Sequence, residues 1–365
     1  MHRISLKAPR GRRATGDRNF RSPARSVPRA ARARPRLPGP PGDVGAAGYG
    51  GAVPEPVIAA RDLVKRYRAK GKPDFVAVDG LSFEVAPGES FGLLGPNGAG
   101  KSTTMKMIGA VSTRSAGELR ILGLDPDHYG PEIRSRLGVI PQQDNLDAEL
   151  NARENLYVYG RYFGLPGKVC AQKADELLAF AQLEDKATSK VEQLSGGMKR
   201  RLTIARGLIN DPRILLLDEP TTGLDPQARH VLWDRLFRLK ERGTTLVLTT
   251  HYMDEAEQLC DRLIVVDKGR IMAEGSPAAL IRAHSSREVL EVRFGSDRNE
   301  EAARSLEGVG DRVEVLPDRV LVYAHDGEAA LERVVAAGHT PLTSLVRRSS
   351  LEDVFLRLTG RSLIE

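Results

Sequence analysis

The feature that most constrains this chain is a glycine-rich octapeptide, Gly95-Pro96-Asn97-Gly98-Ala99-Gly100-Lys101-Ser102, which follows the apolar stretch Ser90–Leu94. Gly95, Gly100, the lysine and the hydroxyl fit the phosphate-loop pattern between a strand and a helix. The glycines let backbone N–H groups surround phosphate oxygens, and the helix N-terminus adds a favourable dipole. We expect Lys101 to hold the β and γ phosphates of a nucleotide and Ser102 to ligate Mg²⁺. The alternative is a glycine-rich turn with an incidental Lys-Ser pair, which the strand-to-helix context disfavours.

An acidic pair completes the expected metal site. Asp218 and Glu219 follow Ile214–Leu217, an apolar run that predicts a strand buried on both faces. Ligands of open α/β sheets bind at such strand ends. We expect Asp218 to hold Mg²⁺ and Glu219 to polarise the attacking water. Alone, the pair would more often be a solvated loop, but phosphoryl transfer needs a phosphate cradle, Mg²⁺ and a water-positioning group together.

From Val57 onwards, short apolar strands alternate with helical stretches, which predicts an α/β fold. Residues 57–85 read as antiparallel strands joined by a loop at 69–74, and further strands are expected at 90–94, 214–217, 245–249 and 263–267. Residues 149–194 read as a helical insert.

Several motifs in a fixed order resemble those of the ATP-binding-cassette family over residues 57 to about 283. The most specific is Leu194-Ser195-Gly196-Gly197-Met198, and Ile140-Pro141-Gln142, Gly223-Leu224-Asp225 and Leu248-Thr249-Thr250-His251 accompany it, with Tyr67 upstream. The resemblance implies a domain at 55–284 with a mixed sheet core and a helical subdomain at about 144–195. ATP and Mg²⁺ are the implied cofactors.

The resemblance also implies roles for single residues. Glu219, His251 and Gln142 would be catalytic, and Ser102, Gln142 and Asp218 would surround the metal. The nucleotide would contact Tyr67, Gly95, Pro96, Asn97, Gly98, Ala99, Gly100, Lys101, Ser102, Thr103, Ser195, Gly196, Gly197 and Asp225.

Each assignment has a structural alternative when taken alone. Tyr67 could be a core aromatic, His251 a structural histidine, and Ser195 simply a helix N-cap. Gln143 directly follows Gln142, and the resemblance favours the residue next to Pro141.

The resemblance implies two partners. In this family, Ser195–Gly197 of one subunit faces the ATP on the phosphate loop of the other, so one phosphate loop per chain implies a homodimer with two ATP. A separate integral membrane permease would be driven by closure of that dimer. The chain would then sit peripherally on the cytoplasmic face of the inner membrane. No apolar run approaches the roughly 20 residues that cross a bilayer.

Residues 151–156, 196–202 and 351–360 resemble more closely the ATPase subunits of bacterial exporters of the drug-resistance and nodulation-factor type. This likeness implies export of a small molecule or lipo-oligosaccharide. The alternative is a soluble cassette ATPase acting on nucleic acid or ribosomes. A single phosphate loop and a short helical insert without heptads disfavour it.

Beyond residue 284, the pattern is strand, helix, strand, strand, helix, strand, helix, with strands at 288–294, 312–316, 319–323 and 343–347. That order is a split βαβ arrangement. It predicts a small ferredoxin-like α+β accessory domain at 285–365.

Residues 1–54 form a basic tail rich in Arg and Pro. Residues 1–42 hold twelve Lys and Arg against Asp17 alone, so these 42 residues carry +11 and the rest of the chain carries −4 of the total +7. The tail is expected to be disordered. It could be a transit-type peptide, a basic arm or upstream sequence from a wrongly assigned start, and we favour the last. A mildly acidic body argues against a nucleic-acid partner.

Overall fold

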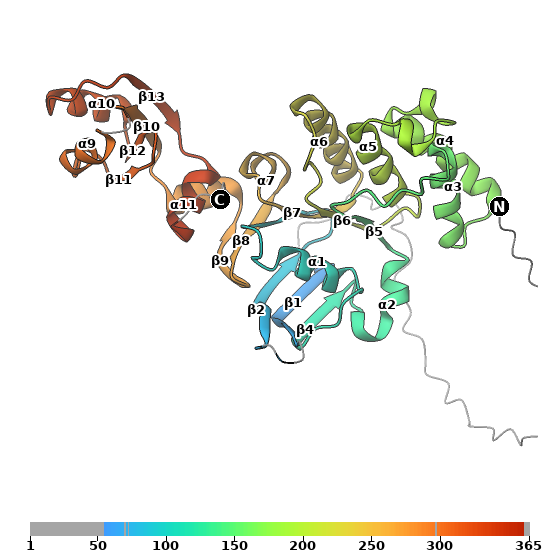
Figure 1. Cartoon of the computed structure of the whole chain (residues 1–365). Helices are drawn as coiled ribbons and strands as arrows, with labels where there is room; N and C mark the ends of the chain where they lie inside the picture. The colour runs from blue at the N-terminus through green and yellow to red at the C-terminus, as the bar shows by residue number, and fades with distance from the viewer. Residues whose placement is uncertain (1–54, 69–70, 72, 296–297, 361–365) are drawn as a thin grey trace, which may run out of the picture. The chain divides into compact units, whose positions relative to one another are not determined.

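The computed structural model describes residues 55–360 except 69–70, 72 and 296–297, and it arranges them as three β-sheets with packed helices (Figure 1). The tail predicted at 1–54 and part of the loop predicted at 69–74 lie outside the described residues.

The central sheet has six strands in the order β5-β6-β7-β3-β8-β9, all parallel except β9. Every residue of β3 and β7 is buried, as expected for strands covered on both faces. The predicted strands at 90–94, 214–217, 245–249 and 263–267 are confirmed. The bounds are β3 (Ser90–Leu94), β5 (Leu137–Ile140), β6 (Ile214–Asp218), β7 (Thr245–Thr250), β8 (Arg262–Asp267) and β9 (Arg270–Gly275).

An antiparallel sheet of order β2-β1-β4 packs against one face of this sheet, with helix α1 between them. Met107 and Ile108 of α1 share one core with Leu63 of β1 and Leu93 of β3. This arrangement confirms the predicted antiparallel pair and the mixed-sheet fold class. The bounds are β1 (Ile58–Tyr67), β2 (Phe75–Val85), β4 (Ala116–Ile121), α1 (Lys101–Ile108) and α2 (Pro126–Arg134).

The opposite face of the central sheet is covered by helices. Because side chains alternate along a strand, Leu216 of β6 joins the first core while Leu215 and Leu217 join the second. Helices that contribute to this second core include α6 (Pro226–Glu241), α7 (Met253–Leu259), α8 (Pro277–His284) and α11 (Leu351–Thr359).

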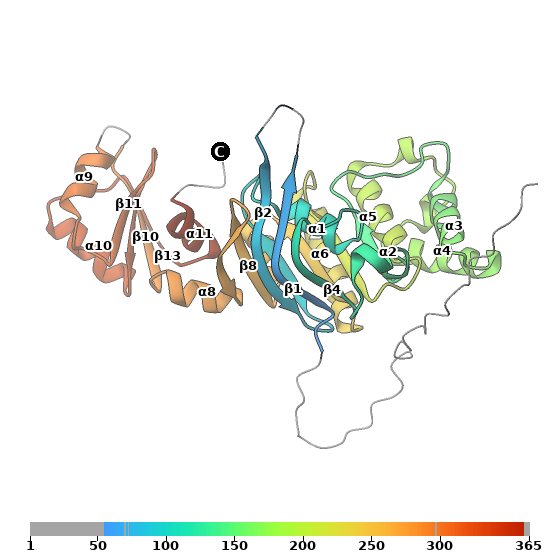
Figure 2. The same cartoon turned by 90° about the horizontal axis from the view of Figure 1, so that it is seen from below.

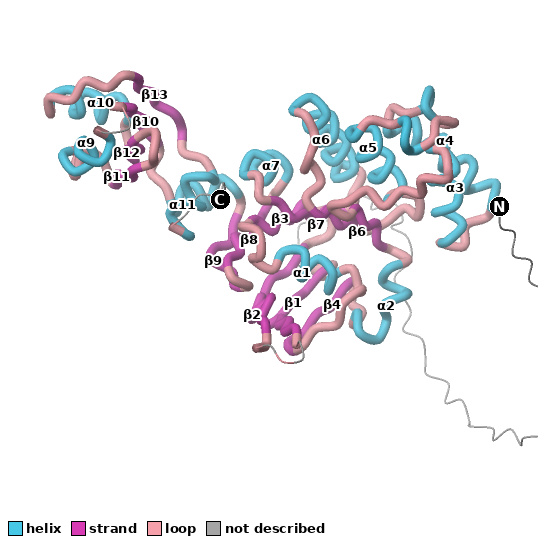
Figure 3. The backbone as a smooth tube through the Cα atoms, in the orientation of Figure 1, coloured by secondary structure: helices cyan, strands magenta, loops and turns pink. Residues whose placement is uncertain are grey.

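The segment between β5 and β6 is helical, as predicted (Figure 3). Asn151 and Glu154 form a capping box at the start of α3, each accepting a backbone N–H of the other. The segment has its own core, which includes Leu156, Leu178 and Leu202. Its elements are α3 (Ala152–Tyr162), α4 (Gly167–Ala181), the short 3₁₀ turns η1 (Glu184–Lys186) and η2 (Val191–Gln193), and α5 (Gly196–Gly207).

The last sheet has the order β11-β12-β10-β13 with all neighbours antiparallel, which is the strand order of the predicted split βαβ arrangement. Figure 2 shows α9 and α10 on one side of this sheet. Leu290 and Val322 face α9 and α10, whereas Tyr323 faces the other way. The bounds are β10 (Glu288–Arg293), α9 (Asn299–Ser305), β11 (Arg312–Val315), β12 (Val320–Ala324), α10 (Gly327–Ala336) and β13 (Thr343–Arg348).

Across the part of the chain that the structure describes, no helix is long and apolar enough to span a bilayer.

Candidate functional site

Three neighbouring parallel strands bring the predicted residues together. β6, β7 and β3 pair side by side in that order. The glycine-rich loop follows β3, the acidic pair ends β6, and His251 follows β7. The carboxyl ends of parallel strands meet at one edge of a sheet, so segments far apart in sequence share one site.

The backbone of the loop needs its glycines. Gly100 directly precedes α1 with φ +104, and a Cβ there would lie 2.3 Å from the carbonyl oxygen of Ala77. A Cβ on Gly95 would lie 2.2 Å from the carbonyl oxygen of Val266. Gly98 also has a positive φ of +80 but points into open space. Close contacts of Gly95 and Gly100 with neighbouring backbone carbonyls therefore fix the loop on one side. The side that carries Gly98 stays accessible.

Lys101 is the buried cation of the loop, with only 5% of its surface exposed. Its Nζ donates to the carbonyl oxygens of Gly95 (2.7 Å) and Pro96 (3.1 Å) and lies 4.0 Å from Oε1 of Glu219. Burial lowers the pKa of Lys101, and the Glu219 and Asp218 carboxylates partly offset that effect. The lysine therefore points along the loop toward the acidic pair.

Ser102 and Asp218 meet as predicted. The Ser102 hydroxyl donates to Oδ1 of Asp218 at 3.1 Å, and the Thr249 hydroxyl donates to the same oxygen at 2.5 Å. A carboxylate and two hydroxyls within contact distance form the hard oxygen set that Mg²⁺ prefers. Sequence reasoning missed Thr249, because the motif Leu248-Thr249-Thr250-His251 points only to its histidine.

Glu219 is the point where the remaining predicted catalytic residues converge. Its Oε2 accepts from Nε2 of Gln142 (3.0 Å) and from the Thr222 hydroxyl (3.3 Å). Nδ1 of His251 lies 3.3 Å from Oε1, within ion-pair distance, but is not aligned for a hydrogen bond. Of the two adjacent glutamines, Gln142 is the one that reaches Glu219, and its role as a catalytic residue stays a prediction.

The backbone of Glu219 is in the left-handed region, with φ +47. Its N–H donates to both the carbonyl and the hydroxyl oxygen of Thr249, each at 3.1 Å. A non-glycine residue there costs roughly 1–2 kcal/mol. The strand pairing holds this strain and turns the carboxylate toward Gln142 and His251.

Arg200 of α5 is a site residue that sequence reasoning missed. Its guanidinium is buried and donates to the carbonyl oxygens of Pro141, Gln142, Asp218, Glu219 and Pro220. It also contacts Asp144 at 3.3 Å. Burial lowers the pKa of Arg200, and the Asp144 carboxylate opposes that shift. One cation from the motif-bearing helix thus joins the backbones that carry Gln142 and Glu219.

Other predicted residues lie on the surface as helix caps. Ser195 accepts from the N–H of Met198 (3.3 Å) at the start of α5, and Asp225 accepts from the N–H of Ala228 (2.8 Å) at the start of α6. Both caps are exposed, as is Gly196, and Gly197 is half-buried. Among the described residues, no hydrogen bond or ion pair joins Ser195–Gly197 to the phosphate loop of the same chain.

The remaining predicted nucleotide contacts vary in exposure. Asn97 is exposed, Ala99 is buried, and Thr103 is half-buried on α1. Tyr67 ends β1 with 41% of its surface exposed, and Nζ of Lys65 lies 5.2 Å from its ring centre. Tyr67 is therefore an exposed aromatic and not part of the core.

Two family descriptions match the sequence. "ABC transporter" matches residues 78–222, and "Nodulation factor export protein NodI, C-terminal domain" matches residues 299–360.

Full-length relatives agree with those matches. The Nod factor export ATP-binding protein I of Paraburkholderia xenovorans is 48% identical over 315 residues, covering 85% of this chain and 99% of that protein. The protein of the same name from a Rhizobium species (strain N33) is 51% identical over 290 residues, covering 80% and 94%.

A solved structure is similar in fold. A dimeric post-hydrolysis state of the ATP-binding cassette MJ0796, bound to ADP and phosphate, is 31% identical with a TM-score of 0.56. The match covers 60% of this chain and 98% of that one. The chain therefore belongs to the ABC transporter family, among its ATP-hydrolysing subunits for export.

Proposed function

We propose that this chain dimerises around two ATP molecules and drives export of a small molecule or lipo-oligosaccharide through a separate integral membrane permease. The observation that supports this proposal most strongly is that the predicted site residues meet beside the carboxyl ends of β3, β6 and β7. These residues are Lys101, Ser102, Gln142, Asp218, Glu219 and His251. The cargo class follows from the relatives named Nod factor export ATP-binding proteins. The proposed location is the cytoplasmic face of the inner membrane.

The phosphate loop, Gly95–Thr103, would bind the nucleotide triphosphate through its backbone N–H groups, with Lys101 on the β and γ phosphates. The exposed ring of Tyr67 would stack on the adenine. These contacts bind and orient ATP but do not cleave it.

The oxygens of Ser102 and Asp218, with Gln142 nearby, fit Mg²⁺. No group of three His, Cys, Asp or Glu side chains among the described residues could hold a metal alone. Mg²⁺ in such sites is held largely by substrate phosphates and water, and Ser102 and Asp218 would supply the protein oxygens. When bound, Mg²⁺ would neutralise charge on the β and γ phosphates.

Glu219 would orient the attacking water and accept its proton, because the carboxylate is buried and fixed by Gln142 and Thr222. His251 would contact the γ phosphate beside it. In-line attack then yields ADP and phosphate.

The exposed Ser195–Gly197 turn favours a dimer. A hydroxyl and free N–H groups at the start of a helix bind phosphate well, and here they are accessible to a second copy. We place this turn on the ATP of the partner subunit, with Asp225 crossing between subunits. ATP would thus favour the closed dimer, and hydrolysis would release it.

Co-purification tests this function. The Glu219→Gln protein, expressed in the native host and extracted from membranes in Mg-ATP, should bring a polytopic membrane protein in matching amount. Lys101→Ala, which should bind ATP weakly, serves as the control bait. Recovery of ribosomes or DNA without a membrane protein would support the soluble-ATPase alternative and contradict the export proposal.

A further inference from the structure

The last helix, α11, belongs to two parts of the molecule at once. Leu351, Val354 and Phe355 are fully buried and pack in the same core as Leu259 of α7 and Leu280 of α8. This apolar face therefore extends the core beneath the central sheet, although α11 follows the accessory sheet in sequence.

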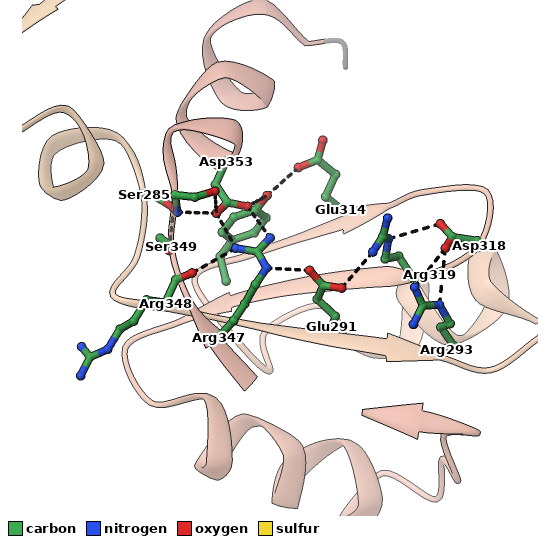
Figure 4. Close-up of polar contacts among 12 residues, drawn as sticks. Ser285, Glu291, Arg293, Glu314, Asp318, Arg319, Arg347, Arg348, Ser349 and Asp353 are labelled. Carbon is green, nitrogen blue, oxygen red and sulfur yellow. Dashed lines mark hydrogen bonds and ion pairs between the residues drawn. The ribbon is translucent and has the colours of Figure 1, made fainter. Parts of the chain in front are cut away.

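The other side of α11 is anchored to the accessory sheet through Asp353, which is fully buried. Arg347 of β13 donates to both of its carboxylate oxygens, at 2.7 and 2.9 Å (Figure 4). The Tyr323 hydroxyl donates to Oδ1 at 3.2 Å. Burial opposes the charge on Asp353, but the hydrogen bonds from Arg347 and Ser350 outweigh it and lower the pKa of this carboxyl.

Arg347 extends the connection into the sheet. Its Nε donates to Oε1 of Glu291 at 2.6 Å, and Arg319 donates to Oε2 of the same carboxylate at 3.0 Å. Figure 4 shows these side chains as a continuous row from Asp353 through Arg347 and Glu291 to Arg319. Bidentate charge-assisted bonds of this kind fix direction as well as distance.

α11 is also tied to α7, at the same N-terminal turn that holds Asp353. Oε1 of Glu257 accepts the N–H of Leu351, the first residue of α11, at 2.6 Å. A carboxylate at a helix N-terminus is favoured by the helix dipole. α7 begins two residues after His251, and His251 lies 3.3 Å from Glu219. A short helix with one buried face thus connects α11 with the catalytic site.

We propose that Arg347, Asp353 and Glu257 are positioning residues for hydrolysis, through which the accessory domain sets the placement of α7 and hence of His251. This inference rests on the role proposed above for His251. A displacement of the accessory sheet would move Arg347, then α11, and then the helix that carries the histidine. The accessory domain thereby controls the rate of hydrolysis without touching ATP.

Neighbouring arginines give a matched pair of variants. Arg347→Ala removes the two hydrogen bonds that the guanidinium donates to Asp353. Arg348→Ala removes an exposed arginine whose guanidinium lies 3.9 Å from Glu288. In the full chain with Mg-ATP, we expect Arg347→Ala to lower kcat about tenfold with KM for ATP within twofold, because the phosphate loop is untouched. Arg348→Ala should match the parent protein. Equal kcat values for the two variants would overturn the proposal.

A second measurement does not depend on activity. Hydrogen exchange of the amides in residues 251–259 should be faster in Arg347→Ala and unchanged in Arg348→Ala. Unchanged exchange in both, or faster exchange with parental kcat, would overturn the coupling. A parent protein without ATPase activity would instead contradict the proposed function, and the exchange result would still decide whether α11 holds α7.

Glu257 offers a variant outside the accessory sheet in case Arg347→Ala does not fold. Glu257→Ala should show the same fall in kcat and the same faster exchange. Glu257→Gln, whose amide oxygen can still accept the N–H of Leu351, should recover most of the rate. Equal kcat in both Glu257 variants would also count against the proposal.

Discussion

At the scale of single residues, the site depends on how Glu219 is held. A carboxylate that is to activate water must keep one orientation, and Glu219 does so with a left-handed backbone, a bond from Gln142 and a bond from Thr222. Lys101 and His251 flank its other oxygen. The proposed base Glu219, the phosphate-loop lysine and His251 are therefore linked by direct contacts, so that changing one is expected to affect the others.

The adjacent residues Gln142 and Gln143 allow a matched comparison of two glutamine variants. Gln142 and Gln143 are both exposed, but among the described residues only Gln142 of the two donates to Glu219, at 3.0 Å. Gln142→Ala should therefore lower kcat about tenfold or more, as expected for loss of an orienting group. Gln143→Ala should stay within twofold of the parent in a steady-state ATPase assay. The reverse order would show that the glutamine assignment is wrong.

Glu255 is a buried acid that the mechanism does not use. Neither of its carboxylate oxygens makes a well-formed hydrogen bond. Burial raises its pKa from 4.5 to about 7, although Thr250, Thr221, Trp233 and Arg229 act in the opposite direction. Since the folded state holds the proton more tightly than the unfolded state, this group should reduce the stability of the fold as pH rises from about 4.5 to about 7.

Glu255→Gln removes that titration. The variant should gain in melting temperature relative to the parent at pH 8, and the difference should shrink toward pH 5. Each unit of pKa shift corresponds to about 1.4 kcal/mol. Thermal denaturation at the two pH values measures it, with Glu241→Gln, an exposed glutamate at the end of α6, as the control. A difference that does not vary with pH would contradict this account.

At the scale of elements, the junction of β3, the loop and α1 yields a prediction from two glycines. Gly98→Ala meets nothing within 4 Å and should cost only the strain of a positive φ, about 1 kcal/mol. Gly100→Ala adds a close approach to the Ala77 carbonyl, so it should cost about 1–3 kcal/mol more. Urea denaturation of both variants compares them. Equal losses would mean that the loop relaxes away from β2.

The sequence predicts these elements well where one physical signal dominates. Buried parallel strands are continuous apolar runs, so β3, β6, β7 and β8 are visible without the structure, and the glycines mark where β3 must end. The strand order of the accessory sheet also follows from its βαββαβ pattern. The crossover through α9 joins β10 to β11 and leaves room for one strand between them, which is β12.

Other features depend on tertiary packing that no local pattern reveals. Arg200 donates to five carbonyl oxygens from two separate loops. Every residue has a backbone carbonyl, so the residue types in those loops do not indicate that an arginine binds there. Thr249 is one of two adjacent threonines, and only the strand register shows which one faces Asp218. Likewise α11 reads as an amphipathic helix, but its partners, α7 and α8, are not implied by its spacing.

At the scale of the whole molecule, one chain supplies a phosphate loop on the central sheet and an exposed Ser195–Gly197 turn on the helical segment. Since the two do not contact each other within the chain, each nucleotide would be completed by a second copy. Dimerisation should therefore depend on ATP and should be strongest when hydrolysis is blocked.

Glu219→Gln should accordingly run as a dimer in size-exclusion chromatography with Mg-ATP and as a monomer with ADP. Adding Gly196→Glu to it gives a specific test. A side chain at Gly196 meets no atom within 4 Å, so the folded monomer should be preserved. The new carboxylate would face the partner's γ phosphate and repel it, so the double variant should stay monomeric in Mg-ATP while still binding ATP. A double variant that dimerises as well as Glu219→Gln would place the subunit interface elsewhere on the molecule.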